Sequence, residues 1–482
     1  MRRSCIRRVG FFGAALLAAL LAAGCAVENG EPLWPEPSAL GRGLPARRAV
    51  DAASRVAVHD RPVEEPVRAL ALRTALALAL TRHPALAAAS WAVRAAEARA
   101  LQEGLSPNPE VRVTMDEFGG TGDFEGTRYS EQVVRLSQVI ELGEKAAKRR
   151  RTAHLEAALC GWDYETARLD VLTETTKAFI AVLAAQQRAA AAEEMRRHAE
   201  SVLALVTKRV RGGAGSEIEV EEARIELGTS RVECEQAKQA LEAARGILAG
   251  CWDAGSPNFR QTTGDLGALP APGVPTWGQV AASIEGNPDV RRWETEVLMC
   301  KAELDRQKAD SIPDLRVLVG SRRLEETGDY GHMAALEVSI PIFDRNQGGI
   351  REARANSAKA GYDRRAFVLV TLTALRQAHQ GLMASHREAA LIRDEILPAA
   401  ERAVATSRQG LEGGAVTDLQ LLKAYRALFK VRSRQIDALE TCHLSLADVE
   451  RLTGRPVTDL VRTKPTGDRA STPVARETSG GR

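Results

Sequence analysis

Few side chains in this sequence stand at spacings that support catalysis or metal binding. The chain has eight histidines, and the pair nearest to a ligand spacing, His379 and His386, lies seven residues apart on an expected helix without an obvious third ligand. We recognise no arrangement of nucleophile and base. The glycine pairs at 212–213 and 413–414 fall in expected turns between helices and not after strands, so they are not phosphate loops. The sequence therefore predicts a protein that is not an enzyme and has neither a cofactor nor a metal site.

The cysteines after residue 25 do not form a readable disulfide framework. They are odd in number and lie mostly in expected helices, so no pairing can be assigned. These five residues are Cys160, Cys234, Cys251, Cys300 and Cys442.

Residues 1–24 have the composition of a secretory signal that ends at Cys25. Arginines precede an apolar run of about 15 residues, which is shorter than the ~20 needed to cross a bilayer. The ending LAAGC resembles the lipobox of bacterial lipoproteins, whose cysteine is lipidated, although Ala22 stands where leucine is usual. We expect a lipid on Cys25; the alternative is an ordinary signal whose cleavage site lies near a cysteine. Ala26 follows, where the inner-membrane retention signal has aspartate, and this favours the outer membrane.

Composition also marks the ends of the chain and excludes one class of partner. Residues 25–66 are dotted with prolines and lack an apolar period, which is typical of an extended tether. The tail 457–482 is polar and is expected to be disordered. The formal net charge is only +3, so the basic cluster at 145–151 indicates a solvated helix start near a membrane and not a nucleic-acid site.

The residues between these ends form two copies of one unit, 67–256 and 257–456. Chance does not explain five matches in one order at a nearly constant offset. The offsets are 201 to 204 residues, and the matches are His83-Pro84 with Asn287-Pro288, Asn108-Pro109 with Ile312-Pro313, 136–140 with 338–342, 213–218 with 414–419, and 248–250 with 452–454. Each unit is predicted to run helix, strand, strand, long helix, turn, long helix.

The longest expected element is a helix over residues 144–211. The stretch contains no proline and one glycine, Gly161, and at 1.5 Å per residue it would be about 100 Å long. Its apolar residues are mostly three, four or seven apart, which makes a narrow seam for packing beside other long helices. Such a helix needs partners of similar length in this chain or in other subunits.

The expected strands alternate between apolar and polar residues. In the first unit the apolar residues Val111, Val113 and Met115 alternate along the chain with the polar residues Arg112 and Thr114. The segments 134–140, 315–319 and 336–342 repeat this pattern. Period two fits either a half-buried soluble sheet or a membrane barrel with lipid outside and water inside. Residues 116–130 and 321–332 are the expected hairpin loops. Four strands leave open edges, so a spanning sheet must close by association of several subunits in a ring.

The order and spacing of these features resemble the TolC-like outer-membrane efflux proteins over residues 70–456. The strings LSQVIELGEKAAKRR (136–150) and VSIPIFDRNQGGI (338–350) resemble the strand-to-helix junctions of that family, above all of its cobalt-zinc-cadmium resistance branch. The resemblance implies a homotrimer with a twelve-stranded membrane β-barrel and a periplasmic α-helical barrel. It also implies a passive outer-membrane duct that docks onto a periplasmic adaptor and an inner-membrane pump.

The two helical hairpin tips resemble the adaptor-binding tips of that family. A glycine there lets the backbone turn with positive φ, and a hydroxyl caps the returning helix. The residues that match are Arg209, Gly213, Ser216 and Val220 in the first unit, and Gly414, Thr417 and Leu421 in the second, where Gly410 replaces the arginine. The resemblance implies contact with the adaptor and a closed end of the tunnel. The alternative is that these residues only form tight turns.

Two functions remain open at this stage. The first is a transport channel, for heavy-metal cations or, as runners-up, for organic drugs or secreted protein. The second is a lipid-anchored periplasmic coiled-coil scaffold, which explains the signal and the helices but leaves the four amphipathic strands without a role.

Overall fold

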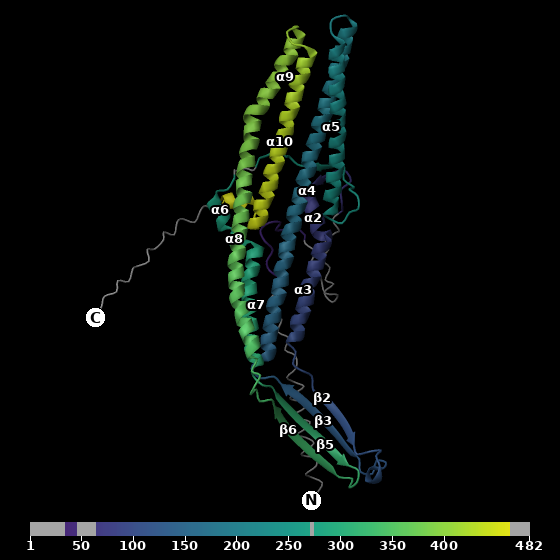
Figure 1. Ribbon diagram of the computed structural model, residues 1–482, viewed down its shortest axis with the longest axis vertical. Helices are drawn as coiled ribbons and strands as arrows, with labels where there is room; N and C mark the ends of the chain where they lie inside the picture. Colours follow the sequence, from purple (N-terminus) through teal and green to yellow (C-terminus); the bar gives the residue numbers. More distant parts are fainter. Residues whose placement is uncertain (1–33, 46–63, 270–273, 463–482) are drawn as a thin grey trace, which may run out of the picture.

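The computed structural model describes residues 34–45, 64–269 and 274–462. Figure 1 shows an elongated body of long helices with a four-stranded sheet at one end and two helical hairpin tips at the other. Helix α4 (Lys145–Arg211) runs from the sheet to the first tip. The sheet and the tips are therefore the opposite ends of the molecule.

The described elements confirm the expected double repeat. The first repeat contains α2 (Leu72–Arg82), α3 (Pro84–Glu103), β2 (Glu110–Asp116), β3 (Glu131–Ile140), α4 and α5 (Glu217–Gly250). The second contains α6 (Trp277–Ala282), α7 (Pro288–Asp310), β5 (Leu315–Leu324), β6 (Tyr330–Val338), α8 (Gln347–Leu391), α9 (Leu397–Glu412) and α10 (Asp418–Thr453). A short parallel pair, β1 (Ala69–Ala71) with β4 (Gln261–Thr263), was not expected.

Helix α4 is confirmed as one uninterrupted α-helix of 67 residues. The corresponding helix of the second repeat is interrupted, because α8 passes through a π-helical turn at Ile392–Ile396 before α9 begins. Pro398 accounts for the interruption, since proline has no N–H and its ring clashes with the carbonyl four residues earlier, that of Asp394. The two repeats therefore share an order of elements but differ in the straightness of their longest helix.

The four long strands form one antiparallel sheet in the order β2-β3-β5-β6. The central pairing joins the two repeats, from Glu131 opposite Leu324 to Ile140 opposite Leu315. Residues directly opposite each other share a face, so the expected apolar face is present. Its members Val113 and Leu336 are 69% and 71% exposed. The described chain therefore leaves the apolar face uncovered and the outer edges of β2 and β6 unpaired.

The second hairpin differs from its expected form. Residues 321–332 do not form a loop, because the β5–β6 ladder continues to Arg323 opposite Tyr330 and leaves only a short turn. Polar residues also occur on the water-facing side of a strand, so the polar composition of residues 321–332 does not by itself indicate a loop. The last strand ends at Val338 and not at Ile342, since Pro341 has no N–H to donate to a ladder.

Residues 34–45 are not the extended tether expected for this part of the segment 25–66. Trp34, Leu40 and Leu44 pack against a buried cluster from α2, α3 and α4. The Trp34 ring stands edge-on to Tyr164, with ring centroids 4.9 Å apart. The backbone N–H of Leu40 also donates to the carbonyl of Gly454. Three apolar side chains without a period help to fix this segment, and a periodicity argument could not detect them.

The start of the polar tail is also ordered. Residues 457–462 form helix α11 (Val457–Arg462), where disorder was expected for 457–482. Val457 and Leu460 are buried in a core cluster with Leu375, and the N–H of Val457 donates to the Glu450 carboxyl. Burial of these two side chains stabilises a helix that is too short to be stable alone. The remaining tail lies outside the described residues, as do residues 1–33.

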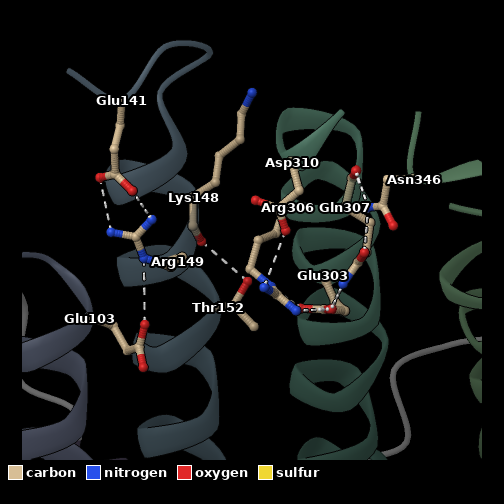
Figure 2. A network of polar contacts seen from close by, with 10 residues as sticks. All are labelled: Glu103, Glu141, Lys148, Arg149, Thr152, Glu303, Arg306, Gln307, Asp310 and Asn346. Atoms are coloured by element: carbon tan, nitrogen blue, oxygen red, sulfur yellow. Dashed lines mark hydrogen bonds and ion pairs between the residues drawn. The ribbon is translucent and has the colours of Figure 1, made fainter. Parts of the chain in front are cut away.

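Polar contacts hold both junctions between sheet and helices (Figure 2). In the first repeat the Arg149 guanidinium pairs with Glu141 at 2.5 Å and with Glu103 at 3.5 Å. In the second repeat the Asn346 side-chain amide donates to the Gln307 carbonyl at 2.8 Å and to its side chain at 2.7 Å. These contacts tie the end of each strand hairpin to the helix before it, so the sheet is held in a set direction relative to the helices.

Candidate functional site at the hairpin tips

The two tips are built around equivalent glycines in the left-handed region. Gly213 has φ +79° and Gly414 has φ +72°. A Cβ added at either position would meet no atom within 4 Å, so the requirement for glycine is conformational and not steric. The expectation of positive φ at both turns is confirmed.

Hydroxyl groups cap both returning helices, as expected. Ser216 Oγ accepts a hydrogen bond from the N–H of Ile218 at the start of α5. Thr417 Oγ1 accepts from the N–H of Gln420, whose side chain in turn accepts from the N–H of Thr417. This reciprocal capping box satisfies N–H groups at the start of α10 that have no partner within the helix.

Val220 and Leu421 lie inside the molecule, only 4% and 5% exposed. Both belong to an apolar cluster that also contains Val206 of α4 and Val404 of α9. These two residues therefore hold the hairpins together. Gly213, Ser216, Gly414 and Thr417, in contrast, are all exposed at the tips.

Arg209 links the first tip to the second, a contact that the sequence did not reveal. One end of its guanidinium is 2.5 Å from Glu219 Oε2, and the other is 2.8 Å from Asp418 Oδ2. Asp418 is 6% exposed, so its carboxylate depends on this cation for compensation. The sequence does show that Asp418 follows the capping residue Thr417 at the start of α10. Only the packing of the two hairpins shows that the partner of this carboxylate is Arg209.

The second tip has no arginine at the corresponding position for a steric reason. A Cβ on Gly410 would lie 2.5 Å from Val416 Cγ2. Val416 turns back over the helix here, and its N–H donates to the Gly410 carbonyl. The two tips are therefore similar in backbone and different in charge.

Two cations of the basic cluster after β3 form ion pairs within the described chain. Lys145 Nζ lies 2.8 Å from Asp314 Oδ1 across the two repeats, and Arg149 belongs to the junction described above. Lys145 is only 8% exposed. These contacts support the interpretation of a helix start and offer these two cations little surface for a polyanion.

The histidines and cysteines show no metal-binding geometry in the part of the chain that the structure describes. His379 is buried, with Nε2 2.8 Å from the Pro275 carbonyl. No described group of three or more His, Cys, Asp or Glu residues could hold a metal ion. All five described cysteines are free. Burial raises the pKa of each of these thiols, which keeps them protonated at neutral pH and makes them poor ligands.

Among the described residues, no helix has a stretch long and apolar enough to span a bilayer. The profile of the family described as "Outer membrane efflux protein" matches residues 75–252 and 280–455, one match for each repeat. The chain belongs to the outer membrane efflux protein family. The expected family resemblance is confirmed.

This efflux protein is similar to curated metal-resistance proteins and to solved outer-membrane channels. It is 28% identical to the cobalt-zinc-cadmium resistance protein CzcC of Cupriavidus metallidurans, over 83% of this chain and 93% of that protein. It is 27% identical to the nickel and cobalt resistance protein CnrC of the same organism, over 61% of this chain and 68% of the relative. The Campylobacter jejuni CmeC outer membrane channel superimposes with a TM-score of 0.67 at 16% identity, covering 80% of this chain and 85% of that one.

Proposed function

We propose that this protein is the outer-membrane channel of a tripartite efflux system and carries heavy-metal cations out of the cell. It acts as a passive exit duct for substrates delivered by an inner-membrane pump and a periplasmic adaptor. Two relatives named for cobalt, zinc, cadmium and nickel resistance support the choice of substrate. Organic drugs and secreted protein are the alternative substrates.

The observation that carries the channel assignment is the amphipathic four-stranded sheet at the end opposite the tips (Figure 1). Its exposed apolar face suits lipid and its polar face suits water. Its two open edges require further strands, because unpaired backbone groups are too costly within a bilayer. Three subunits would supply twelve strands and close the barrel, while the long helices would surround a periplasmic tunnel. A lipid-anchored scaffold would leave this sheet without a purpose.

Membrane fractionation separates the channel from the scaffold. A channel is expected in the outer-membrane fraction as a heat-stable trimer that resists mild salt and carbonate. A scaffold held only by a lipid and by helix contacts would be recovered without such a trimer or would be released by these treatments.

We further propose that the exposed tip residues contact the adaptor. Gly213, Ser216, Gly414 and Thr417 are all exposed there, at the end of the helices furthest from the sheet. Arg209 would act through its bridge to Asp418, which sets the spacing of the two tips. Val220 and Leu421 would support the tips from inside.

We also propose that Cys25 carries a lipid that anchors the chain to the outer membrane, in a part of the sequence outside the described residues. Replacing it by serine (C25S) is expected to abolish incorporation of labelled fatty acid while leaving the trimer able to assemble, because the barrel supplies its own apolar surface. Gel mobility with and without globomycin, which blocks lipoprotein processing, checks the claim. Wild-type processing that globomycin does not block would contradict it.

A further inference from the structure

We propose that Arg112 and Arg135 of each subunit form a ring that binds small anions inside the β-barrel. This inference rests on the proposed function, because the ring exists only if three subunits close the sheet. In that barrel the polar face of the sheet lines the water-filled interior. Each subunit would then contribute two arginines at the same level.

The pairing of β2 with β3 places the two arginines side by side. Arg112 lies directly opposite Arg135 in the antiparallel ladder, so both project from the polar face with Cβ atoms about 4.5–5.5 Å apart. Like charges in this position destabilise a sheet. Neither guanidinium has an acidic partner among the described residues, and Arg135 Nε is buried without a hydrogen-bond partner.

The rest of the row provides no compensating charge. Arg135 lies opposite Gly320 of β5, and Gly320 lies opposite Met333 of β6. A Cβ on Gly320 would be 3.2 Å from Arg135 Cγ and 3.2 Å from Met333 Cγ. The stem of Arg135 therefore lies across the glycine, and the row contains two positive charges and no carboxylate.

The other arginines on the polar face of the sheet form ion pairs with carboxylates. Arg316 lies 3.2 Å from Glu110, and Arg322 lies 3.6 Å from Glu131. Glu110 and Arg322 stand in the rows next to the Arg112–Arg135 row, about 7 Å away along the strands, and their partners Arg316 and Glu131 stand one row further away. Their carboxylates are already engaged, so they weaken the positive charge of the Arg112–Arg135 row without cancelling it.

The chemistry of the ring selects its ligand. A guanidinium binds oxyanions through two parallel N–H donors, and several arginines converging on a pore favour anions and phosphates over cations. The ligand class is therefore a small multivalent oxyanion. At this level of the barrel a free divalent cation would meet a repulsive potential, whereas a metal in an anionic complex would be attracted.

The test is block of single-channel current by inorganic pyrophosphate, added to the side of the bilayer opposite the helical tips. The full-length wild-type protein is expected to be blocked. In R112Q/R135Q the half-blocking concentration should rise at least about fivefold, because all six positive charges of the trimeric ring are lost. R112K/R135K should be blocked more strongly than R112Q/R135Q but less strongly than wild type, since lysine keeps the charge and loses the paired donors.

A matched control removes a different arginine that also lies across a glycine. A Cβ on Gly331 would be 3.4 Å from Arg322 Cγ, so R322Q/E131Q deletes a comparable arginine together with its own carboxylate and should be blocked like wild type. Equal block of wild type and R112Q/R135Q would overturn the ring while leaving the channel in place. Equal loss of block in the control variant would also overturn it. A wild-type protein that forms neither trimers nor currents would instead contradict the proposed function.

Discussion

The substitution R168L is expected to lower the free energy of unfolding by about 3–5 kcal/mol, because it leaves a buried carboxylate without its cation. Arg168 and Glu165 of α4 are 2% and 1% exposed, and their charged groups are 2.7 Å apart. An exposed pair of the same kind contributes at most about 1 kcal/mol. Burial, and not the pairing alone, therefore accounts for the expected loss.

The same pair fastens residues 34–45 to the helical body. Glu165 accepts a hydrogen bond from the N–H of Ser38 at 2.6 Å, and Arg168 donates to Ser38 Oγ and to the Leu40 carbonyl, each at 3.1 Å. R168L should therefore also release this segment. Faster protease cleavage within residues 34–45 of the folded protein would report the release.

The matched control for R168L is R224L in helix α5. Arg224 pairs with Glu221 at the same spacing of three residues, but these side chains are 61% and 60% exposed. Its effect should stay within about 1 kcal/mol. The midpoints of thermal unfolding of the two purified variants provide the comparison. Similar midpoints would mean that the buried pair does not stabilise the helical body.

The double substitution G213V/S216A is expected to reduce metal resistance towards that of a deletion strain while leaving the amount of trimer in the outer membrane nearly unchanged. Valine at φ +79° is strained by about 1–2 kcal/mol, and loss of the Ser216 cap costs about 1 kcal/mol more. Both changes act at the tip, and the sheet lies at the other end of the molecule (Figure 1). Coupling to the adaptor should therefore suffer more than insertion of the barrel.

G228A/S201A provides the control in the same hairpin. Gly228 lies within α5 with no atom within 4 Å of its Cβ position, and Ser201 lies exposed on α4. These substitutions should leave both resistance and trimer at wild-type levels. Normal metal export by G213V/S216A would show that Gly213 and Ser216 only form the turn and do not contribute to coupling with the adaptor.

The long helix and the strands could be predicted from the sequence because their signals are local. The absence of proline from 144–211 and the period of two in 111–115 each describe one element by itself. The turn glycines Gly213 and Gly414 were predictable for the same reason, since positive φ is a local requirement. Family resemblance then implied the homotrimer, its membrane β-barrel and its periplasmic α-helical barrel.

The features that were missed depend on contacts between distant segments. The bridge from Arg209 to Asp418 joins two hairpins that lie some 200 residues apart in the chain. The order of residues 34–45 depends on a pocket made by α2, α3 and α4. The row of Arg112 and Arg135 requires the register of two strands. None of these three features produces a hydrophobic period or a recognisable motif within a single segment of the sequence.

The measurement that tests the central claim most directly is growth of a strain lacking this gene, with and without the gene restored, across zinc, cobalt, cadmium, nickel, copper, silver and a set of organic toxicants. The account predicts selective sensitivity to one or more of the metals, reversed by the restored gene. Sensitivity to organic compounds alone would contradict the metal assignment and leave a channel of another specificity. Unchanged growth under every condition, in a strain without a second such channel, would contradict the efflux function itself.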